Sequence, residues 1–201
     1  MQASGSGATS HLPDELRGPC PVEWLPSALK NGGMGLLMTN DNPIDIKPAT
    51  PGDVPLVLSF IKGLTEYEGL ADEVVATEED LQASLFGPHP SAEVVIAYRE
   101  AEAVGFAVFC QRYSSYLGRP ILYLEDIFVL HQWRGSGVGR ELMVYGGGLA
   151  QARGYPRMYW SVLDWNEPAI EFYKNLGAQK AEGWSTYWIS SDALVRLGPP
   201  D

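Results

Sequence analysis

The chain has 201 residues, of which 45% are hydrophobic and 19% are charged, and its formal net charge is -11. This composition is typical of a globular protein with one substantial core, and the acidic balance argues against nucleic-acid binding, which needs a basic face. No run of eighteen apolar residues occurs, so no membrane-spanning helix is expected.

The N-terminal part, residues 1–43, contains Gly-Ser repeats and several prolines without helical or strand periodicity. It is expected to be an irregular extension, and residues 44–201 are expected to form the functional domain. A first strand is predicted at Ile44–Pro48. An amphipathic helix follows, marked by Val54, Val57, Leu58, Ile61 and Leu64. The sequence Thr77–Asp80 is typical of a capping box that opens a second, short helix.

The middle of the chain alternates strand and helix signals. Strands at Glu93–Tyr98 and Val104–Phe109 flank a short polar turn, which predicts a hairpin. The remaining predicted elements, in chain order, are a strand at Ile121–Leu130, a helix at 137–153, a strand at Met158–Leu163, a helix at Asn166–Leu176 and two closing strands around Trp184–Ile189.

Three consecutive glycines, Gly146–Gly148, lie inside the predicted helix 137–153. Relative to alanines they cost a helix roughly 3 kcal/mol. The helix is still expected, because Leu142, Tyr145 and Leu149 keep helical spacing on either side. The glycines are explained either by a close approach of the helix to the sheet or by a bend.

The segment Arg134–Arg140 carries a glycine-rich turn between a predicted strand and a predicted helix. Such a turn points backbone N–H groups toward a bound diphosphate, and the helix dipole adds positive potential. Its glycines are spaced G-x-G-x-G, which excludes both the dinucleotide fingerprint and the Walker loop. The alternative is a tight connection that uses glycines for steric reasons only.

A second motif begins at Asn166. Asn166 is a good helix N-cap, Pro168 is tolerated in a first helical turn, and Gly177 stands where a C-terminal glycine belongs. Between them, Ala169, Phe172, Tyr173 and Leu176 share one helical face.

Together, Arg-x-x-Gly-x-Gly and Asn-x-x-Ala-x-x-Phe-Tyr resemble the two halves of the acetyl-CoA site in the GNAT superfamily of N-acetyltransferases. Within it, the diamine acetyltransferases (the spermidine/spermine and thialysine enzymes) fit best. The segments that carry this resemblance are Glu66–Glu68, Phe86–Pro90, Tyr123–Val129, Trp165–Pro168 and Glu182–Trp184. The resemblance runs from about Ile44 to Ile189. It implies an α/β (α+β) GNAT fold, with a mixed, mostly antiparallel sheet of six to seven strands, splayed central strands and about four helices.

The resemblance also implies acetyl-CoA as cosubstrate, and it assigns its contacts. The residues implied are Ile127, Phe128 and Val129 for the pantetheine arm, Arg134, Gly135, Ser136, Gly137, Val138, Gly139 and Arg140 for the diphosphate, and Asn166, Glu167, Pro168, Ala169 and Tyr173 on the other side. For Arg134 a surface position is nearly as well supported.

An alkylamine is protonated at neutral pH, so a nearby carboxylate is needed to bind the cation and accept a proton. Glu125 is the expected anchor and water-mediated base. Asp126 is expected to be secondary, because neighbouring residues of a strand point to opposite faces. The resemblance assigns Tyr173 as the acid that protonates the leaving thiolate. The alternative for Asp126 is a structural role, and for Tyr173 it is core packing.

For the amine itself, the resemblance points to Tyr67, Glu68, Glu182 and Trp184, in addition to Glu125 and Asp126. Separated carboxylates suit a flexible polycation, and a tryptophan face adds a cation–π contact. Each of these glutamates is otherwise a solvated surface residue.

The predicted function is therefore an acetyl-CoA-dependent N-acetyltransferase for a small cationic amine. The alternatives are an aminoglycoside or protein amine as substrate, and a non-catalytic acyl-CoA-binding sensor. The three histidines and the two cysteines, Cys20 and Cys110, have no metal-ligand spacing, and no metal is expected. A cytoplasmic location is expected from the cysteine usage, and the family implies a homodimer.

Overall fold

The computed structural model describes residues 43–198. The predicted N-terminal extension, residues 1–43, lies outside this range except for Pro43. The chain divides into two compact units, the first ending at Ser161 and the second beginning at Val162. Within the described residues no helix is long and apolar enough to cross a membrane.

The first unit contains one five-stranded sheet in the order β1-β2-β3-β4-β5. The strands are β1 (Ile44–Pro48), β2 (Glu93–Arg99), β3 (Glu102–Ser114), β4 (Arg119–Val129) and β5 (Met158–Tyr159). Neighbours are antiparallel except for β4 and β5, which are parallel. The fold class is thus confirmed, with five strands among the described residues rather than six to seven.

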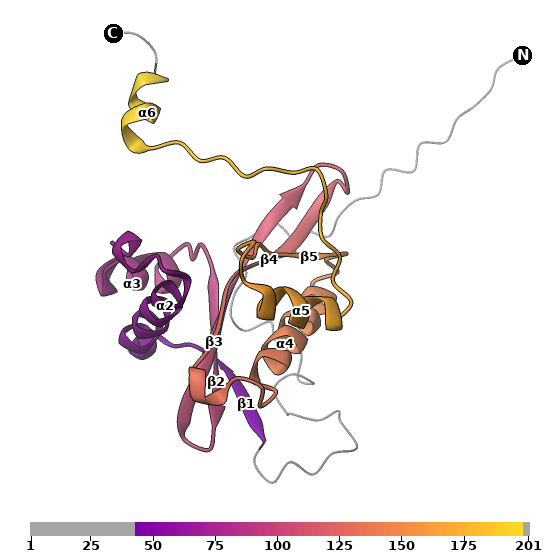
Figure 1. Cartoon of the computed structure of the whole chain (residues 1–201). Helices are drawn as coiled ribbons and strands as arrows, with labels where there is room; N and C mark the ends of the chain where they lie inside the picture. Colours follow the sequence, from indigo (N-terminus) through magenta and orange to yellow (C-terminus); the bar gives the residue numbers. More distant parts are fainter. Residues whose placement is uncertain (1–42, 199–201) are drawn as a thin grey trace, which may run out of the picture. The chain divides into compact units, whose positions relative to one another are not determined.

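Helices cover both faces of this sheet (Figure 1). On one side lie α2 (Val54–Glu68) and α3 (Glu78–Phe86), and on the other lies α4 (Val138–Ala152). The capping box predicted at Thr77 is present, with its hydroxyl accepting a hydrogen bond from the Asp80 amide. The core between α2 and the sheet contains Val57, Phe60, Leu64, Val94, Ile96, Phe106, Val108 and Phe128.

The triple glycine lies in an uninterrupted α4, and Gly146 explains part of it. A Cβ at this position would lie 2.7 Å from Cε1 of Phe109 and 3.1 Å from Sδ of Met158. Of the two explanations, the close approach to the sheet therefore applies to Gly146. A Cβ at Gly147 would meet nothing within 4 Å, so that glycine has no steric cause.

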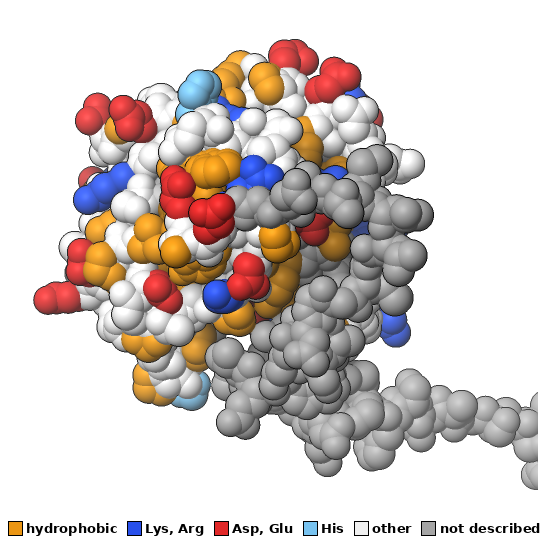
Figure 2. Space-filling view, turned by 90° about the horizontal axis from the view of Figure 1, so that it is seen from below, with side chains coloured by type: hydrophobic (Ala, Val, Ile, Leu, Met, Phe, Trp, Pro, Cys, Tyr) orange, Lys and Arg blue, Asp and Glu red, His pale blue; other side chains and the backbone are white. Residues whose placement is uncertain are grey.

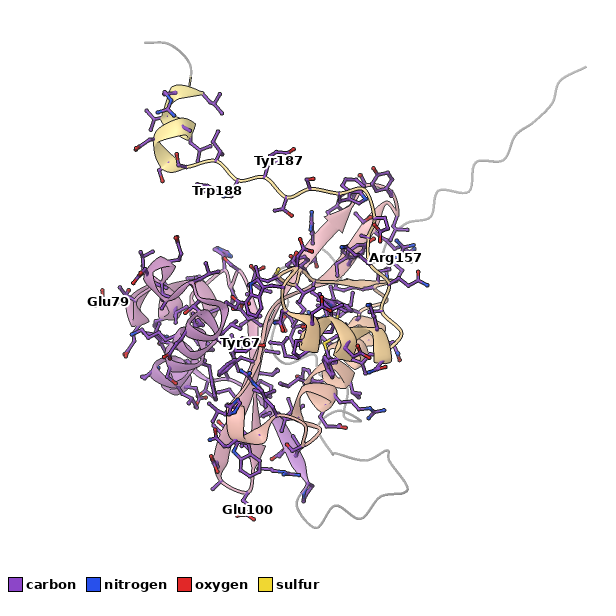
Figure 3. All side chains as sticks on the ribbon, in the orientation of Figure 1. Tyr67, Glu79, Glu100, Arg157, Tyr187 and Trp188 are labelled. Carbon is purple, nitrogen blue, oxygen red and sulfur yellow. The ribbon has the colours of Figure 1, made fainter. Side chains whose placement is uncertain are left out.

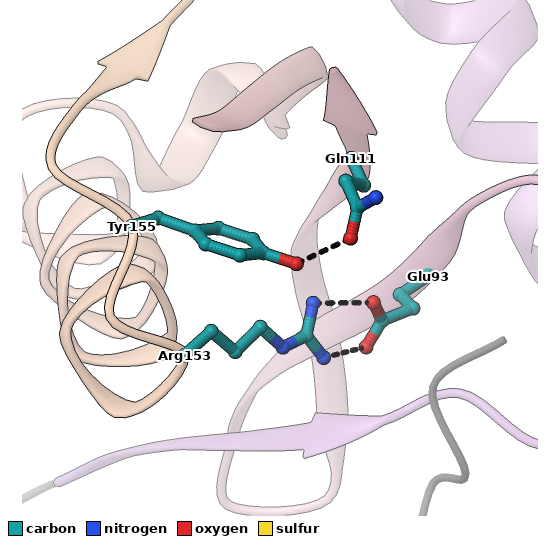
Figure 4. Close-up of polar contacts among 4 residues, drawn as sticks. All are labelled: Glu93, Gln111, Arg153 and Tyr155. Carbon is teal, nitrogen blue, oxygen red and sulfur yellow. Dashed lines mark hydrogen bonds and ion pairs between the residues drawn. The ribbon is translucent and has the colours of Figure 1, made fainter. Parts of the chain in front are cut away.

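The C-terminal end of α4 is fastened to β2 and β3 (Figure 4). Arg153 forms a bidentate ion pair with Glu93, both N···O distances being 2.7 Å. Beside it, the Tyr155 hydroxyl donates to the side-chain oxygen of Gln111. Two parallel charge-assisted bonds fix the guanidinium orientation as well as its position, so this pair ties the end of α4 to β2.

Strand β5 is much shorter than the predicted Met158–Leu163. It pairs with β4 only at Leu122 and Tyr123. From Leu124 to Val129, β4 therefore has no strand neighbour on that side among the described residues. This open edge is the splay that the fold class implied, and it leaves backbone groups of β4 available beside the glycine-rich turn.

The second unit contains α5 (Glu167–Asn175) and α6 (Ser191–Arg196). The prediction of two closing strands around Trp184–Ile189 was wrong, since residues 178–190 contain no strand, and α6 was not predicted. Aromatic and β-branched residues favour a strand only where an adjacent strand accepts the backbone hydrogen bonds, and no such ladder includes this segment. Tyr187 and Trp188 on it are 89% and 86% exposed (Figure 3).

Candidate active site

The glycine-rich turn has the backbone conformation that its glycines allow. Gly135 and Gly137 have φ values of +74° and +94°, in the left-handed region that other residues rarely adopt. Gly137 is the N-cap of α4, and no side chain caps this helix. The turn thus opens the helix without placing a side chain over its first backbone amides.

Those amides form the candidate diphosphate cradle. Ser136 is engaged within the turn, because its amide and hydroxyl both donate to the Trp133 carbonyl, at 3.4 and 2.6 Å. By contrast, the amides of Gly137, Val138, Gly139 and Arg140 have no acceptor among residues 43–198. Orphan N–H groups at a helix start, with the dipole behind them, favour a bound anion.

Arg134, the first residue of the turn, is held by the protein itself. Its Nε donates to the Val129 carbonyl at 3.1 Å. Its guanidinium carbon lies 4.1 Å from the centroid of the Tyr67 ring and 5.7 Å from that of Phe128. One of the three β4 residues predicted to face the pantetheine arm, Val129, therefore has its carbonyl oxygen engaged by Arg134.

The expectation that Glu125 and Asp126 point to opposite faces of the sheet was wrong. In the ladder between β3 and β4, Leu124 lies opposite Phe109 and Asp126 lies opposite Val108, so Glu125 is an extra residue at a β-bulge. Phe109 packs against α4, whereas Val108 belongs to the core under α2. The bulge shifts the alternation by one, and both carboxylates are presented on the α2 side.

The raised pKa of Asp126 agrees with the placement of Glu125 and Asp126 on the same side of the sheet. Burial, followed by the charges of Glu125 and Glu68, raises the pKa of Asp126 from 3.8 to about 6. Burial also raises the pKa of Glu68 at the end of α2. The structure therefore brings three of the predicted amine ligands within electrostatic range of one another. An added cation would be stabilised here, because Asp126 and Glu68 are partly buried and Asp126 also lies near two like charges.

The same face carries side chains that the sequence analysis did not assign. Cys110 is half-buried, and its thiol pKa is raised by burial and then by the charge of Glu125. The guanidinium of Arg112 lies over the Tyr123 ring at 5.5 Å, and the Tyr123 hydroxyl is 3.1 Å from that of Ser161. Cys110 and Arg112 lie on β3 and face β4 only through the pairing of the two strands, so no local sequence pattern indicates them.

In the second unit, α5 follows the local chemistry predicted for it. The Asn166 side-chain oxygen accepts from the Ala169 amide at 3.3 Å, and Glu167 and Pro168 form the first turn. At the other end Gly177 has φ +88°, as expected for a glycine after a helix.

Within this unit, Asn166 and Tyr173 are buried, at 7% and 8% exposure, and the Tyr173 ring centroid lies 5.2 Å from that of Phe172. Glu182 and Trp184 lie on the segment without regular structure and are exposed.

Acidic side chains are not confined to this site. On the face shown in Figure 2 they are spread among apolar and basic ones. Among the described residues, no group of three or more His, Cys, Asp and Glu side chains has an arrangement that would hold a metal ion.

Comparison with known proteins now gives the family. Residues 62–178 match the model of the Acetyltransferase (GNAT) family. The chain is 37% identical over 163 residues to a thialysine N-epsilon-acetyltransferase of Sus scrofa, covering 76% of this chain and 95% of that protein. It is 28% identical over 197 residues to an L-ornithine N5-acetyltransferase of Arabidopsis thaliana, covering 76% and 86% of the two chains.

Among solved structures, an integron cassette protein from the mobile metagenome of V. cholerae superposes with a TM-score of 0.64 at 26% identity. The match covers 77% of this chain and 96% of that one. The chain therefore belongs to the GNAT family and is an N-acetyltransferase. Within that family it is similar to enzymes named for small amines, among them thialysine and ornithine.

Proposed function

We propose that this protein transfers an acetyl group from acetyl-CoA to the primary amine of a small cationic substrate, such as a diamine, a polyamine or a lysine analogue. The observation that carries the proposal is the placement of Glu125 and Asp126 on one face, close enough to Glu68 for their charges to interact. A cluster of carboxylates suits a substrate with more than one positive charge.

The amides of Gly137–Arg140 are suited to the diphosphate of acetyl-CoA, whose thioester supplies the acetyl group. The backbone of Ile127 and Phe128 is proposed to contact the pantetheine arm. Asn166–Ala169 is proposed as a cofactor contact on the family resemblance of its sequence alone.

In the proposed reaction the carboxylates first bind the substrate ammonium. Glu125, which is exposed, accepts a proton through water and leaves the amine lone pair free for attack on the carbonyl carbon. A C–N bond forms and the C–S bond breaks. Tyr173 donates its phenolic proton to the departing thiolate and is reprotonated from solvent. Tyr67, Glu182 and Trp184 are proposed as further amine contacts.

The first test is CoA thiol release from acetyl-CoA by the purified protein. The amines are putrescine, spermidine, lysine, thialysine, an aminoglycoside and a peptide with a free amine. Tyr173→Phe and Glu125→Gln are expected to lower kcat by about 100-fold or more. The matched controls are Tyr187→Phe and Glu79→Gln, two exposed residues outside the proposed site, and they should retain wild-type rates.

Three other outcomes would replace the proposal. Turnover of the aminoglycoside alone would identify a drug-type substrate, for which one relative named a streptothricin acetyltransferase, 32% identical over 127 residues, is the specific support. Acetylation only of a peptide amine would identify a protein substrate. Tight CoA binding without any turnover would indicate a sensor.

Homodimerisation, a cytoplasmic location and a functional domain spanning residues 44–201 remain predictions made from the sequence. Light scattering and the thiol-release assay, applied to the full chain and to a variant starting at Ile44, test the first and the last of these. The expected result is a dimer with the same specific activity in both forms.

A further inference from the structure

The Arg134 side chain joins three parts of the first unit at one point. It begins the glycine-rich turn, donates to the last carbonyl of β4 at Val129, and stacks on Tyr67 near the end of α2. A guanidinium can do this because its faces are free for stacking while its edge donates hydrogen bonds. The turn is therefore attached to α2 by the arginine side chain as well as through β4.

The surface that receives Arg134 is built from the core. The Phe128 ring lies 6.4 Å from the Phe60 ring in an edge-on arrangement and is 8% exposed. A Cβ at Gly63 would lie 3.1 Å from Phe128, so the glycine lets α2 come close. Tyr67 follows Gly63 by four residues and shares its helical face. Figure 3 shows Tyr67 on the side of α2 toward the sheet.

The neighbours of this contact belong to the two halves of the proposed reaction. On one side, Arg134 leads directly into the amides of the diphosphate cradle. On the other side, Tyr67 directly precedes Glu68, whose charge acts on Asp126. The stacked pair of Arg134 and Tyr67 therefore joins the turn to the residue that directly precedes Glu68.

We propose that Arg134 is a positioning residue, which through its contact with Tyr67 couples cofactor binding at the turn to the amine end of the site. This inference rests on the proposed function, because it takes the turn to bind the CoA diphosphate. It differs from a direct charge role for Arg134, in which Tyr67 would have no influence on CoA affinity.

The test is a double-mutant cycle on CoA binding, measured by titration calorimetry with free CoA and the full chain. The variants are Tyr67→Leu, Arg134→Met and the pair, with Tyr67→Phe as the matched control that keeps the aromatic face. Tyr67→Leu is expected to weaken CoA binding by about three- to thirty-fold, which is the worth of a partly dehydrated cation–π contact. In the Arg134→Met background it should have no further effect, and Tyr67→Phe should bind like wild type.

The possible outcomes distinguish failure of the coupling from failure of the proposed function. Equal loss from Tyr67→Leu in both backgrounds, or no loss in either, would overturn the coupling while leaving CoA binding established. Failure of the wild-type protein to bind CoA would refute the proposed function, and this inference with it. Circular dichroism of each variant identifies any loss that comes from unfolding. Where turnover is measurable, Tyr67→Leu should also raise the KM for acetyl-CoA more than it lowers kcat.

Discussion

Replacing Asp126 by asparagine is expected to stabilise the ligand-free protein at neutral pH. Asp126 is half-buried, and the charges of Glu125 and Glu68 add to the cost of burial, so the folded state disfavours its ionised form. Asparagine has nearly the same shape and carries no charge at any pH. The substitution therefore removes the electrostatic cost and leaves the bulge and its packing in place.

The magnitude follows from the pKa of the carboxyl, which is raised from 3.8 to about 6 in the folded chain. This difference corresponds to at most about 3 kcal/mol, and partial solvent access reduces it to about 1–3 kcal/mol. Below about pH 4 the group is protonated in both folded and unfolded chains and costs nothing. As the pH rises from 4 through 6, the wild-type protein loses this stability, because ionisation is harder when folded.

The assay is urea unfolding of wild type and Asp126→Asn at several pH values between 4 and 8, under conditions where both unfold reversibly. The free energies of unfolding should differ little at pH 4, and the variant should become the more stable by about 1–3 kcal/mol above pH 6. Glu79→Gln, an exposed carboxylate on α3, is the control and should follow wild type. Parallel pH profiles for wild type and Asp126→Asn would refute the reasoning.

Two further predictions concern α4. Gly146→Ala is expected to destabilise the fold by about 1–3 kcal/mol, because its Cβ would lie 2.7 Å from the Phe109 ring. Gly147→Ala, with open space around it, should stabilise the fold by about 0.5–1 kcal/mol. Thermal unfolding compares the two variants, and stability changes of the same sign would contradict the packing explanation. Arg153→Met is expected to cost about 1–3 kcal/mol in urea unfolding, because it leaves the Glu93 carboxylate without its bidentate partner. Adding Glu93→Gln should recover part of this loss, and a double variant no better than the single one would show that the loss comes from packing.

Local chemistry explains which elements were predictable. The caps at Thr77 and Asn166 involve residues close together in the sequence, and both appear as expected. The turn at Gly135–Gly137 was also predicted from residue type, and Gly135 and Gly137 have the positive φ that glycine adopts readily. The prediction of closing strands was wrong because strand formation depends on residues distant in the sequence. Strand formation around Trp184 depends on a partner that its own sequence does not specify.

The bulge at Glu125 shows why the candidate site could be listed from the sequence and yet not assembled from it. Regular alternation places Glu125 and Asp126 on opposite faces, and nothing in the two residue types contradicts it. The extra residue arises from the register of β4 against β3, which is a property of the pair of strands. One unpaired residue turns two separate carboxylates into a cluster with Glu68. The raised pKa of Asp126 reflects first its burial and then the charges of the other two carboxylates. A bound cation would offset the electrostatic cost of ionising Asp126, so a feature that destabilises the ligand-free chain at neutral pH is suited to a cationic amine.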